Sequence, residues 1–232
     1  MNILATICCR GGSKGVKQKN SKLFCGKPLM AYTIEAALKC AYFTDVIVST
    51  DSEAIADIAR DYGIQKIYMR PPELATDEAS KWQVFIHALE KYESETSKSV
   101  DYLVDLDVTV PLKTTEDISQ TIAFALQNKN ADVVITAYQP ERNPYFNMME
   151  IQPDGFATMV KKTLEPIVRR QDAPQVFSLT PAVYVIKKEA LYNYDHWSNA
   201  KCMLFEIPRL RAIDIDTEID FSFVEFLLNE RK

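Results

Sequence analysis

A loop rich in glycine and cationic residues is the part of this sequence that most directly indicates phosphate chemistry. It spans residues 10–20 and follows an apolar run, residues 3–9, that has the length and composition of a buried strand. Glycine lets the backbone take positive φ and approach a ligand closely, and successive N–H groups then face an anion together with the cations. The glycines are Gly11, Gly12 and Gly15, and the cations are Arg10, Lys14, Lys17 and Lys19. The loop therefore predicts a site for a polyanion, with a nucleoside triphosphate as the first candidate.

The spacing of these glycines excludes two familiar nucleotide motifs. A P-loop needs Gly, four residues and then Gly-Lys-Ser or Gly-Lys-Thr, and a dinucleotide fingerprint needs Gly-x-Gly-x-x-Gly. The segment instead reads Arg-Gly-Gly-Ser-Lys-Gly, followed by Lys-x-Lys-Asn at residues 17–20. A solvated basic turn is the plainer alternative, because glycine and lysine are ordinary loop residues. The density of glycines and cations at one strand end favours the anion site.

A second group of chemically suggestive residues lies near the C-terminus. Asp214 and Asp216 alternate along a segment that we expect to be extended, so their carboxylates project to the same side, about 6 to 7 Å apart. Two hard oxygen ligands at that spacing suit Mg²⁺ that also holds a triphosphate. An acidic turn before a helix is the alternative, and it explains Asp220 well because Thr217 and Asp220 form a capping-box pattern.

The elements that must position these residues follow from the apolar periodicity. Strand-like runs at residues 45–50, 66–69, 102–107 and 132–137 alternate with helix-like stripes, which predicts a mostly parallel sheet with helices on both faces. Ligands bind beyond the carboxyl ends of such strands. Asp105 and Asp107 fall at one of these ends, and we favour Asp107 as the functional residue, serving Mg²⁺, a sugar hydroxyl or an amino substituent.

Length and composition indicate one domain. The 232 residues suffice for one full core. The composition changes at residues 139–188, which contain several prolines, and we expect this stretch to be an inserted antiparallel β segment. The net charge of −5 argues against nucleic acid as a partner. The sequence has no apolar run of membrane-spanning length and no signal peptide, so we expect a cytoplasmic protein. The five cysteines lack metal-ligand spacing and are expected to be buried free thiols.

The loop and the acidic pair together resemble the acylneuraminate cytidylyltransferase family, which makes CMP-activated sialic acids and related nonulosonates. The resemblance extends from Arg10 to Phe226, and the stretches at residues 142–147 and 170–171 are similar to those of legionaminate-type members. Two positions depart from the pattern. Asp107 stands where many members have a glutamine near the sugar, and Thr180 stands where an asparagine is common.

The resemblance implies a role for each candidate residue, of which Arg10, Lys19 and Asp216 are the catalytic ones. Arg70 would donate to the O2 and N3 acceptors of cytosine, and Arg170 would pair bidentately with the carboxylate of the sugar acid. Ser80 would contact the nucleotide, although a helix N-cap explains it at least as well. In full, the triphosphate would be held by Arg10, Gly11, Gly12, Ser13, Lys14, Gly15 and Lys19, the nucleoside by Asn20, Arg70 and Ser80, the sugar by Asp107, Arg170 and Gln171, and Mg²⁺ by Asp214 and Asp216.

The function implied is transfer of CMP from CTP to the 2-hydroxyl of a nonulosonic acid, such as sialic or legionaminic acid, with release of pyrophosphate. The nearer alternative is a cytidylyltransferase for a 3-deoxy-octulosonate, including its 8-amino form. The remote alternative is a non-catalytic nucleotide sensor on the same Rossmann-like nucleotidyltransferase scaffold. The apolar residues of the inserted segment, among them Tyr145, Phe146 and Met148, predict a homodimer.

Overall fold

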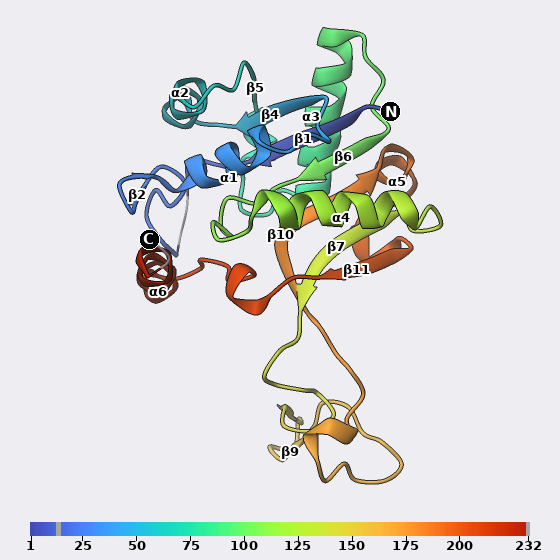
Figure 1. Ribbon diagram of the computed structural model, residues 1–232. Helices are drawn as coiled ribbons and strands as arrows, with labels where there is room; N and C mark the ends of the chain where they lie inside the picture. The colour runs from blue at the N-terminus through green and yellow to red at the C-terminus, as the bar shows by residue number, and fades with distance from the viewer. Residues whose placement is uncertain (13–14, 231–232) are drawn as a thin grey trace.

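The apolar runs of the sequence form a seven-stranded central sheet in the computed structural model, which describes residues 1–12 and 15–230 (Figure 1). The strand order is β11-β7-β10-β6-β1-β4-β5. Strand β10 runs antiparallel to both its neighbours, and the other adjacent pairs are parallel, which confirms the mostly parallel sheet. The strands are β1 (Ile3–Cys8), β4 (Asp45–Thr50), β5 (Lys66–Met69), β6 (Tyr102–Asp105), β7 (Val133–Tyr138), β10 (Ser178–Lys187) and β11 (Cys202–Glu206).

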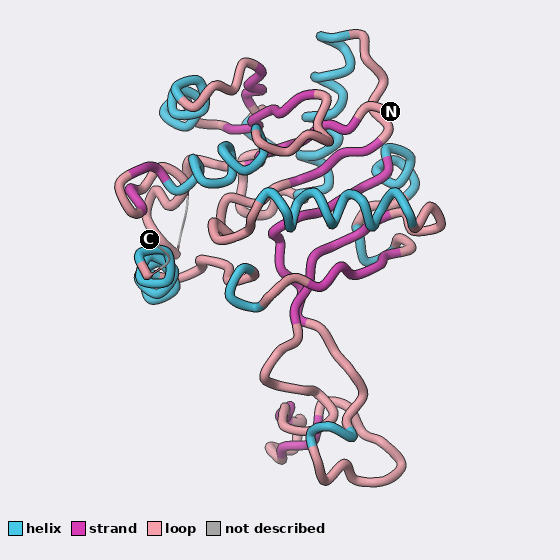
Figure 2. The backbone as a smooth tube through the Cα atoms, in the orientation of Figure 1, coloured by secondary structure: helices cyan, strands magenta, loops and turns pink. Residues whose placement is uncertain are grey.

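Helices cover both faces of this sheet, as Figure 2 shows for the backbone. Residues of α1, α2, α4 and α6 belong to one core cluster, and residues of α3 and α5 belong to the other. The helices are α1 (Leu29–Leu38), α2 (Glu53–Asp61), α3 (Lys81–Thr96), α4 (Thr115–Gln127), α5 (Lys188–Asn193) and α6 (Glu218–Asn229). Within the described residues, no helix combines the length and the apolar character needed to cross a membrane.

Strand β1 is apolar at every position except Thr6, because alternate side chains point into two different core clusters. Ile3, Ala5 and Ile7 face the core cluster under α1 and α4, whereas Leu4 faces the cluster under α3. Both faces of a central parallel strand are buried, so both sets of alternating residues must be apolar. Because the middle of the strand is buried on both faces, charged side chains lie beyond its ends.

Helix starts follow the polar residues that the sequence offers as caps. Thr114 and Asp117 form a capping box at the start of α4, and Thr217 and Asp220 form another at the start of α6. Each box satisfies backbone N–H groups of the first turn that have no partner within the helix. The box expected at Thr217 is thereby confirmed, and the box at Thr114 is an additional one. Ser80 occupies the N-cap position of α3, but its side chain makes no capping hydrogen bond.

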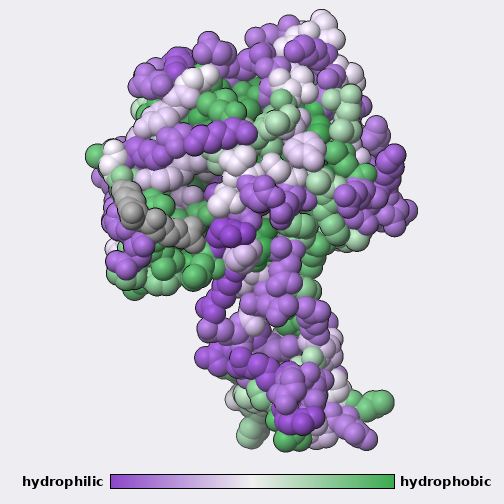
Figure 3. Space-filling view, in the orientation of Figure 1, coloured by the Kyte–Doolittle hydropathy of each residue, from purple (hydrophilic) through white to green (hydrophobic). Residues whose placement is uncertain are grey.

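Residues 139–177 leave the sheet between β7 and β10 and form an arm that stands away from the body (Figures 1 and 3). The arm carries a short antiparallel hairpin, β8 (Met149–Ile151) with β9 (Ala157–Met159), and the 3-10 turn η2 (Arg170–Asp172). The expected insert of residues 139–188 is longer than this arm, because β10 pairs with β6 and β7 in the central sheet. A second small pair, β2 (Leu23–Phe24) with β3 (Lys27–Pro28), precedes α1.

The order of connections creates a crevice at β1. From β1 the chain passes to β4 and β5 on one side, and later returns to β6 on the other side. In open α/β sheets, ligands bind outside the carboxyl ends of the strands where the direction of connection reverses. The loop of residues 10–20 leaves β1 at this point.

Candidate active site

A cavity of about 310 Å³ lies at the end of β1 and gathers six of the residues that the sequence singled out. These residues come from the loop after β1, the exit of β6 and the turn before α6. They are Arg10, Gly15, Lys19, Asn20, Asp107 and Asp216. The structure thus brings together segments that are almost two hundred residues apart in the sequence.

Contacts to the sheet hold the loop after β1 in place. The Asp51 carboxylate accepts a hydrogen bond from the Gly11 amide at 2.8 Å, and the Asn20 side-chain amide donates to the Arg10 carbonyl at 2.9 Å. Val16 is fully buried and anchors the middle of the loop. Asn20 therefore lines the cavity and also braces the loop. Ser13 and Lys14, two of the predicted triphosphate ligands, lie outside the described residues.

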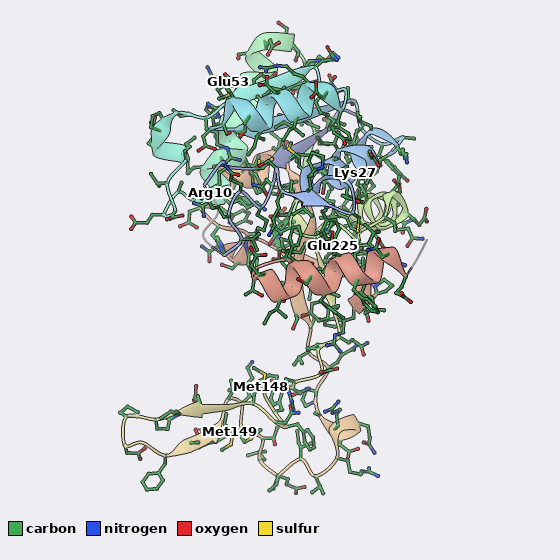
Figure 4. The ribbon with its side chains drawn as sticks, turned by 90° about the vertical axis from the view of Figure 1, so that its left-hand side faces the viewer. Arg10, Lys27, Glu53, Met148, Met149 and Glu225 are labelled. Carbon is green, nitrogen blue, oxygen red and sulfur yellow. The ribbon has the colours of Figure 1, made fainter. Side chains whose placement is uncertain are left out.

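Arg10 reaches from this loop to the segment before α3, and Figure 4 shows it within the body, well separated from the arm. Its guanidinium donates to an Asp77 carboxylate oxygen at 2.5 Å and to the Thr76 carbonyl at 3.3 Å. Both charged side chains of this ion pair remain more than one-third exposed. Arg10 is therefore neutralised by a carboxylate in a setting where a phosphate oxygen would make the same hydrogen bonds.

Lys19 and Gly15 connect the loop with the turn before α6. The Lys19 ammonium donates to the Ile215 carbonyl and lies 3.9 Å from an Asp216 carboxylate oxygen. Gly15 packs so closely that a Cβ at this position would lie 2.0 Å from the Asp216 carbonyl oxygen. This contact requires glycine, and it fixes the phosphate loop against the acidic pair.

Asp214 and Asp216 both line a neighbouring cavity of about 680 Å³, which also has Tyr138 and Phe223 in its wall. One Asp214 carboxylate oxygen is buried and has no hydrogen-bond partner among the residues that the structure describes, and burial raises the pKa of that carboxyl group. The Asp216 side chain is 77% exposed. An orphaned buried oxygen beside an open carboxylate fits a hard divalent cation.

The donor set decides which cation would fit. Among the described residues, no group of three or more His, Cys, Asp or Glu side chains is arranged to hold a metal. A complete protein cage is thus absent from this part of the chain, and a bound ion would depend on phosphate and water oxygens. Mg²⁺ commonly binds in this way, through one or two carboxylates plus substrate phosphates.

Asp107 lies just beyond β6 and is held by three hydrogen bonds. The Thr109 amide and hydroxyl donate to one carboxylate oxygen at 3.1 and 3.0 Å, and the Lys81 ammonium donates to the other at 2.8 Å. Burial alone would raise the pKa of this carboxyl group, but Lys81 and Thr109 lower it to about 2. Asp107 is accordingly a fixed anion in the cavity wall. Asp105, the completely buried last residue of β6, also contacts Lys81.

A second cavity, of about 290 Å³, meets the first at Cys8 and Arg10. Arg70 and Lys81 lie in its wall. The Arg70 guanidinium donates to the Ser49 hydroxyl at 3.0 Å and to the Ser49 carbonyl at 2.8 Å, so its plane is fixed at the end of β4. Ser80 is exposed and is not among the residues that line this cavity.

Arg170 and Gln171 are the two predicted sugar ligands that the structure does not bring to these cavities. Both are exposed residues of η2 on the arm, which Figure 4 shows below the body and well away from Arg10. Thr180, which stands where the resembled family commonly has asparagine, is buried. Its hydroxyl donates to the Ala212 carbonyl at 2.9 Å, so it joins β10 to the segment that leads to Asp214.

Two residues of the site were missed by sequence reasoning. Neither Lys81 nor Asp77 is among the candidate residues that the sequence analysis named. Only the long-range pairing of Lys81 with Asp107 and of Asp77 with Arg10 shows that they belong here. The neighbouring thiols do not add nucleophilic chemistry, because burial raises the pKa of Cys8 and raises that of Cys9 to about 12.

Comparison with known proteins agrees with this geometry. The profile of a family described as "Cytidylyltransferase" matches residues 4–227. The chain is 39% identical to "Post-translational flagellin modification protein B" of Campylobacter coli, over 99% of the chain and 96% of the relative. It is 37% identical to "CMP-N,N'-diacetyllegionaminic acid synthase" of Campylobacter jejuni, over 98% of the chain and 95% of the relative.

Solved structures show the same fold at lower identity. A CMP:2-keto-3-deoxy-manno-octonic acid synthetase complexed with CTP superposes with a TM-score of 0.74 at 15% identity, and each chain is covered completely. A 4-diphosphocytidyl-2C-methyl-D-erythritol synthase from Anaerococcus prevotii superposes with a TM-score of 0.69 at 16% identity, over 98% of both chains. At these identities the likeness concerns the fold.

Proposed function

The chain belongs to the cytidylyltransferase family, and from that premise we propose that it transfers CMP from CTP to the 2-hydroxyl of a nonulosonic acid and releases pyrophosphate. One observation carries the proposal. A single cavity at the end of β1, where the direction of the strand connections reverses, is lined by Arg10, Lys19, Asp107 and Asp216. The relative at 37% identity supports a nonulosonic acid as the acceptor, since it is a CMP-N,N'-diacetyllegionaminic acid synthase.

The residues of the cavity suit an in-line displacement at the α-phosphorus. Arg10, Lys19 and the loop amides would bind the triphosphate and neutralise the charge that develops as pyrophosphate leaves. Arg70, which Ser49 holds in a fixed plane, would donate to the cytosine ring in the second cavity. Such chemistry depends on alignment and charge neutralisation, so a covalent nucleophile is not required.

Asp214 and Asp216 are the residues that we propose hold Mg²⁺. When bound, the ion would neutralise phosphate oxygens and help to orient the leaving group. The buried, unpartnered oxygen of Asp214 and the exposed carboxylate of Asp216 support this assignment. Lys19 contacts the same turn and would approach the triphosphate from the loop side.

The sugar ligands on the arm lead us to propose a homodimer. Arg170 and Gln171 lie on the arm and away from the cavities of their own chain, so a second copy would have to place them near a bound sugar acid (Figure 4). The arm also exposes large apolar side chains, including Ile151, Phe156 and Val168, which are 75–82% exposed. A two-fold interface is the commonest way to cover such side chains. Light scattering at micromolar concentration tests this, and a monomeric mass would refute it.

The activity is tested by pyrophosphate release from CTP in the presence of Mg²⁺, across a panel of nonulosonic and octulosonic acids. We expect turnover with a nonulosonic acid and with CTP in preference to UTP, ATP or GTP. Turnover only with an octulosonic acid would move the substrate to the eight-carbon class, and turnover at least as fast with a purine nucleotide would exclude CTP selectivity. Because CTP and sugar precursors are cytoplasmic metabolites, the cytoplasm is the compartment that we propose.

A further inference from the structure

Lys81, the first residue of α3, joins two carboxylates at the end of β6. Its ammonium nitrogen lies 2.8 Å from an Asp105 oxygen and 2.8 Å from an Asp107 oxygen. The Asp105 side chain is completely buried, whereas two-fifths of the Lys81 side chain is exposed. We name Lys81, Asp105 and Asp107 the acid–lysine triad. It spans from the interior of the sheet to the wall of the cavities.

Further contacts hold every member of the triad in one position. The Thr6 hydroxyl donates to the second oxygen of Asp105 at 3.1 Å, and Thr109 donates to the second oxygen of Asp107. The Lys81 ammonium lies 5.3 Å from the centre of the Tyr184 ring, which adds a cation–π contact. The Asp107 carboxylate therefore has little freedom to rotate.

The triad lies where two cavities meet. Asp107 lines the cavity of the phosphate loop, Lys81 lines the cavity of Arg70, and Arg10 lines both. A nucleotide with its phosphates in the first cavity and its base in the second passes directly along this wall. The acceptor sugar must meet the α-phosphorus in the same region.

Stability alone does not account for the triad. Burying Asp105 completely and Asp107 largely is costly, and buried ion pairs are often no more stabilising than apolar residues of similar size. Ionic groups retained at such a cost are expected mainly where a site needs them. An isolated Asp107 carboxylate would also repel an anionic sugar acid and a triphosphate, and the Lys81 ammonium offsets that repulsion.

On the basis of the proposed function, we propose that Lys81 is a positioning and specificity-determining residue, which orients Asp107 as a hydrogen-bond acceptor for an N–H or O–H group of the sugar acid. The pair presents an acceptor from Asp107 and a neighbouring cation from Lys81. Together they suit a substrate that is rich in donors, and the ammonium reduces the repulsion of that substrate's own negative charge. This description fits an acylamino sugar acid better than an uncharged sugar.

The test compares Lys81→Met, Lys81→Arg and the double variant Asp105→Asn/Lys81→Met in the pyrophosphate-release assay, with thermal melts alongside. We expect Lys81→Met to raise KM for the sugar acid at least tenfold while KM for CTP changes less than threefold. Lys81→Arg should recover most of the sugar-acid affinity because it keeps the charge. The double variant has the same net charge as the wild type, so it should regain thermal stability but keep the raised sugar-acid KM.

The following outcomes would overturn the inference. If the double variant regains both stability and wild-type KM, Lys81 only compensates the buried charge of Asp105. If Lys81→Met raises both KM values equally, the residue does not act on the sugar acid. Wild-type protein that releases no pyrophosphate with any sugar acid refutes the proposed function and this inference together, whereas active wild type with unchanged variants refutes this inference alone.

Discussion

Gly15 of the phosphate loop lies directly against the backbone of Asp216, so closely that a Cβ on Gly15 would come within 2.0 Å of the Asp216 carbonyl oxygen. Lys19 adds a hydrogen bond to the Ile215 carbonyl beside it. The loop that follows β1 and the turn that precedes α6 are therefore one packed unit. The groups proposed to bind phosphate and those proposed to bind Mg²⁺ cannot move apart without breaking this contact.

We predict that Gly15→Ala damages both stability and activity. The new methyl group would displace the Asp216 backbone, at an overpacking cost of about 1–3 kcal/mol in the free energy of unfolding. A displacement of about 1 Å at a reacting centre lowers kcat/KM on the order of 100-fold. Urea denaturation and turnover with CTP measure the two effects.

Gly12→Ala is the matched control for stability, because a Cβ on Gly12 would meet no atom within 4 Å. Its free energy of unfolding should stay within about 0.5 kcal/mol of the wild-type value. Equal destabilisation by both substitutions would contradict the importance of the Gly15–Asp216 contact.

We predict that Asp77→Asn strengthens the binding of CTP. Asp77 pairs with Arg10 in the structure, so a phosphate group must compete with this carboxylate. An exposed pair of this kind contributes about 0.2–1 kcal/mol, which corresponds to a fall in Kd for CTP of about 1.4- to 5-fold. Isothermal titration calorimetry with CTP measures the change.

Asp57→Asn serves as the control for that measurement. Asp57 makes an ion pair with Arg60 at the same 2.5 Å distance on the exposed side of α2, and neither residue lines the cavities of the site. Its substitution should leave CTP affinity unchanged. Weaker binding by Asp77→Asn would mean that Asp77 orients Arg10 and does not compete with phosphate.

The fold was largely predictable from sequence because its determinants are local. The capping box at Thr217 depends on residues three positions apart, and the burial of β1 on both faces follows from a run that is apolar except for Thr6. The rule that ligands bind at strand ends then located Arg10, Lys19 and Asp107 correctly around one cavity. Each of these inferences needed only a short window of sequence and one general rule.

The partners of these residues were not predictable, because they come from distant segments. Nothing near Asp107 indicates that its counter-charge is Lys81, 26 residues earlier, or that Asp105 shares the same ammonium. Likewise, the composition of residues 139–177 indicated an insert, but only coordinates show that it projects from the body and that β10 returns to the sheet. Tertiary pairing of charges leaves no periodic signal in a sequence.

We predict that Lys113 makes stability depend on pH near neutrality. Burial lowers the pKa of its ammonium group to about 7, although Asp107 and Asp105 act in the opposite direction. The unfolded chain keeps a lysine pKa of about 10.4, so between these values the unfolded state binds more protons than the folded state. The contribution of Lys113 to the free energy of unfolding should therefore rise with pH above about 7 and be constant below it.

Urea denaturation of wild type and Lys113→Met at pH 6, 7, 8 and 8.5 measures this contribution as the difference between the two proteins. The substitution also leaves the Thr33 hydroxyl and the Val110 carbonyl without their donor, so it should lower stability by about 1–3 kcal/mol at every pH. A difference that does not vary with pH would show that the buried ammonium stays charged and keeps all its hydrogen bonds.

We predict that Asp216→Asn abolishes most of the activity and leaves the fold intact. The Asp216 side chain is 77% exposed, and its ion pair within the described residues is the 3.9 Å contact with Lys19, so the melting temperature should hardly change. Loss of a carboxylate that holds Mg²⁺ against the triphosphate should cost about 3 kcal/mol or more of transition-state stabilisation, which is on the order of 100-fold or more in kcat. Asp214→Asn should reduce turnover similarly, because its buried oxygen has no other partner among the described residues.

The measurement is turnover against Mg²⁺ concentration at saturating CTP, with thermal melts alongside. The control is Asp61→Asn, which changes an exposed acid at the end of α2 and should keep the wild-type turnover. If the Asp214→Asn and Asp216→Asn proteins melt normally and keep the wild-type rate and Mg²⁺ dependence, the two residues are only the acidic lead-in to α6.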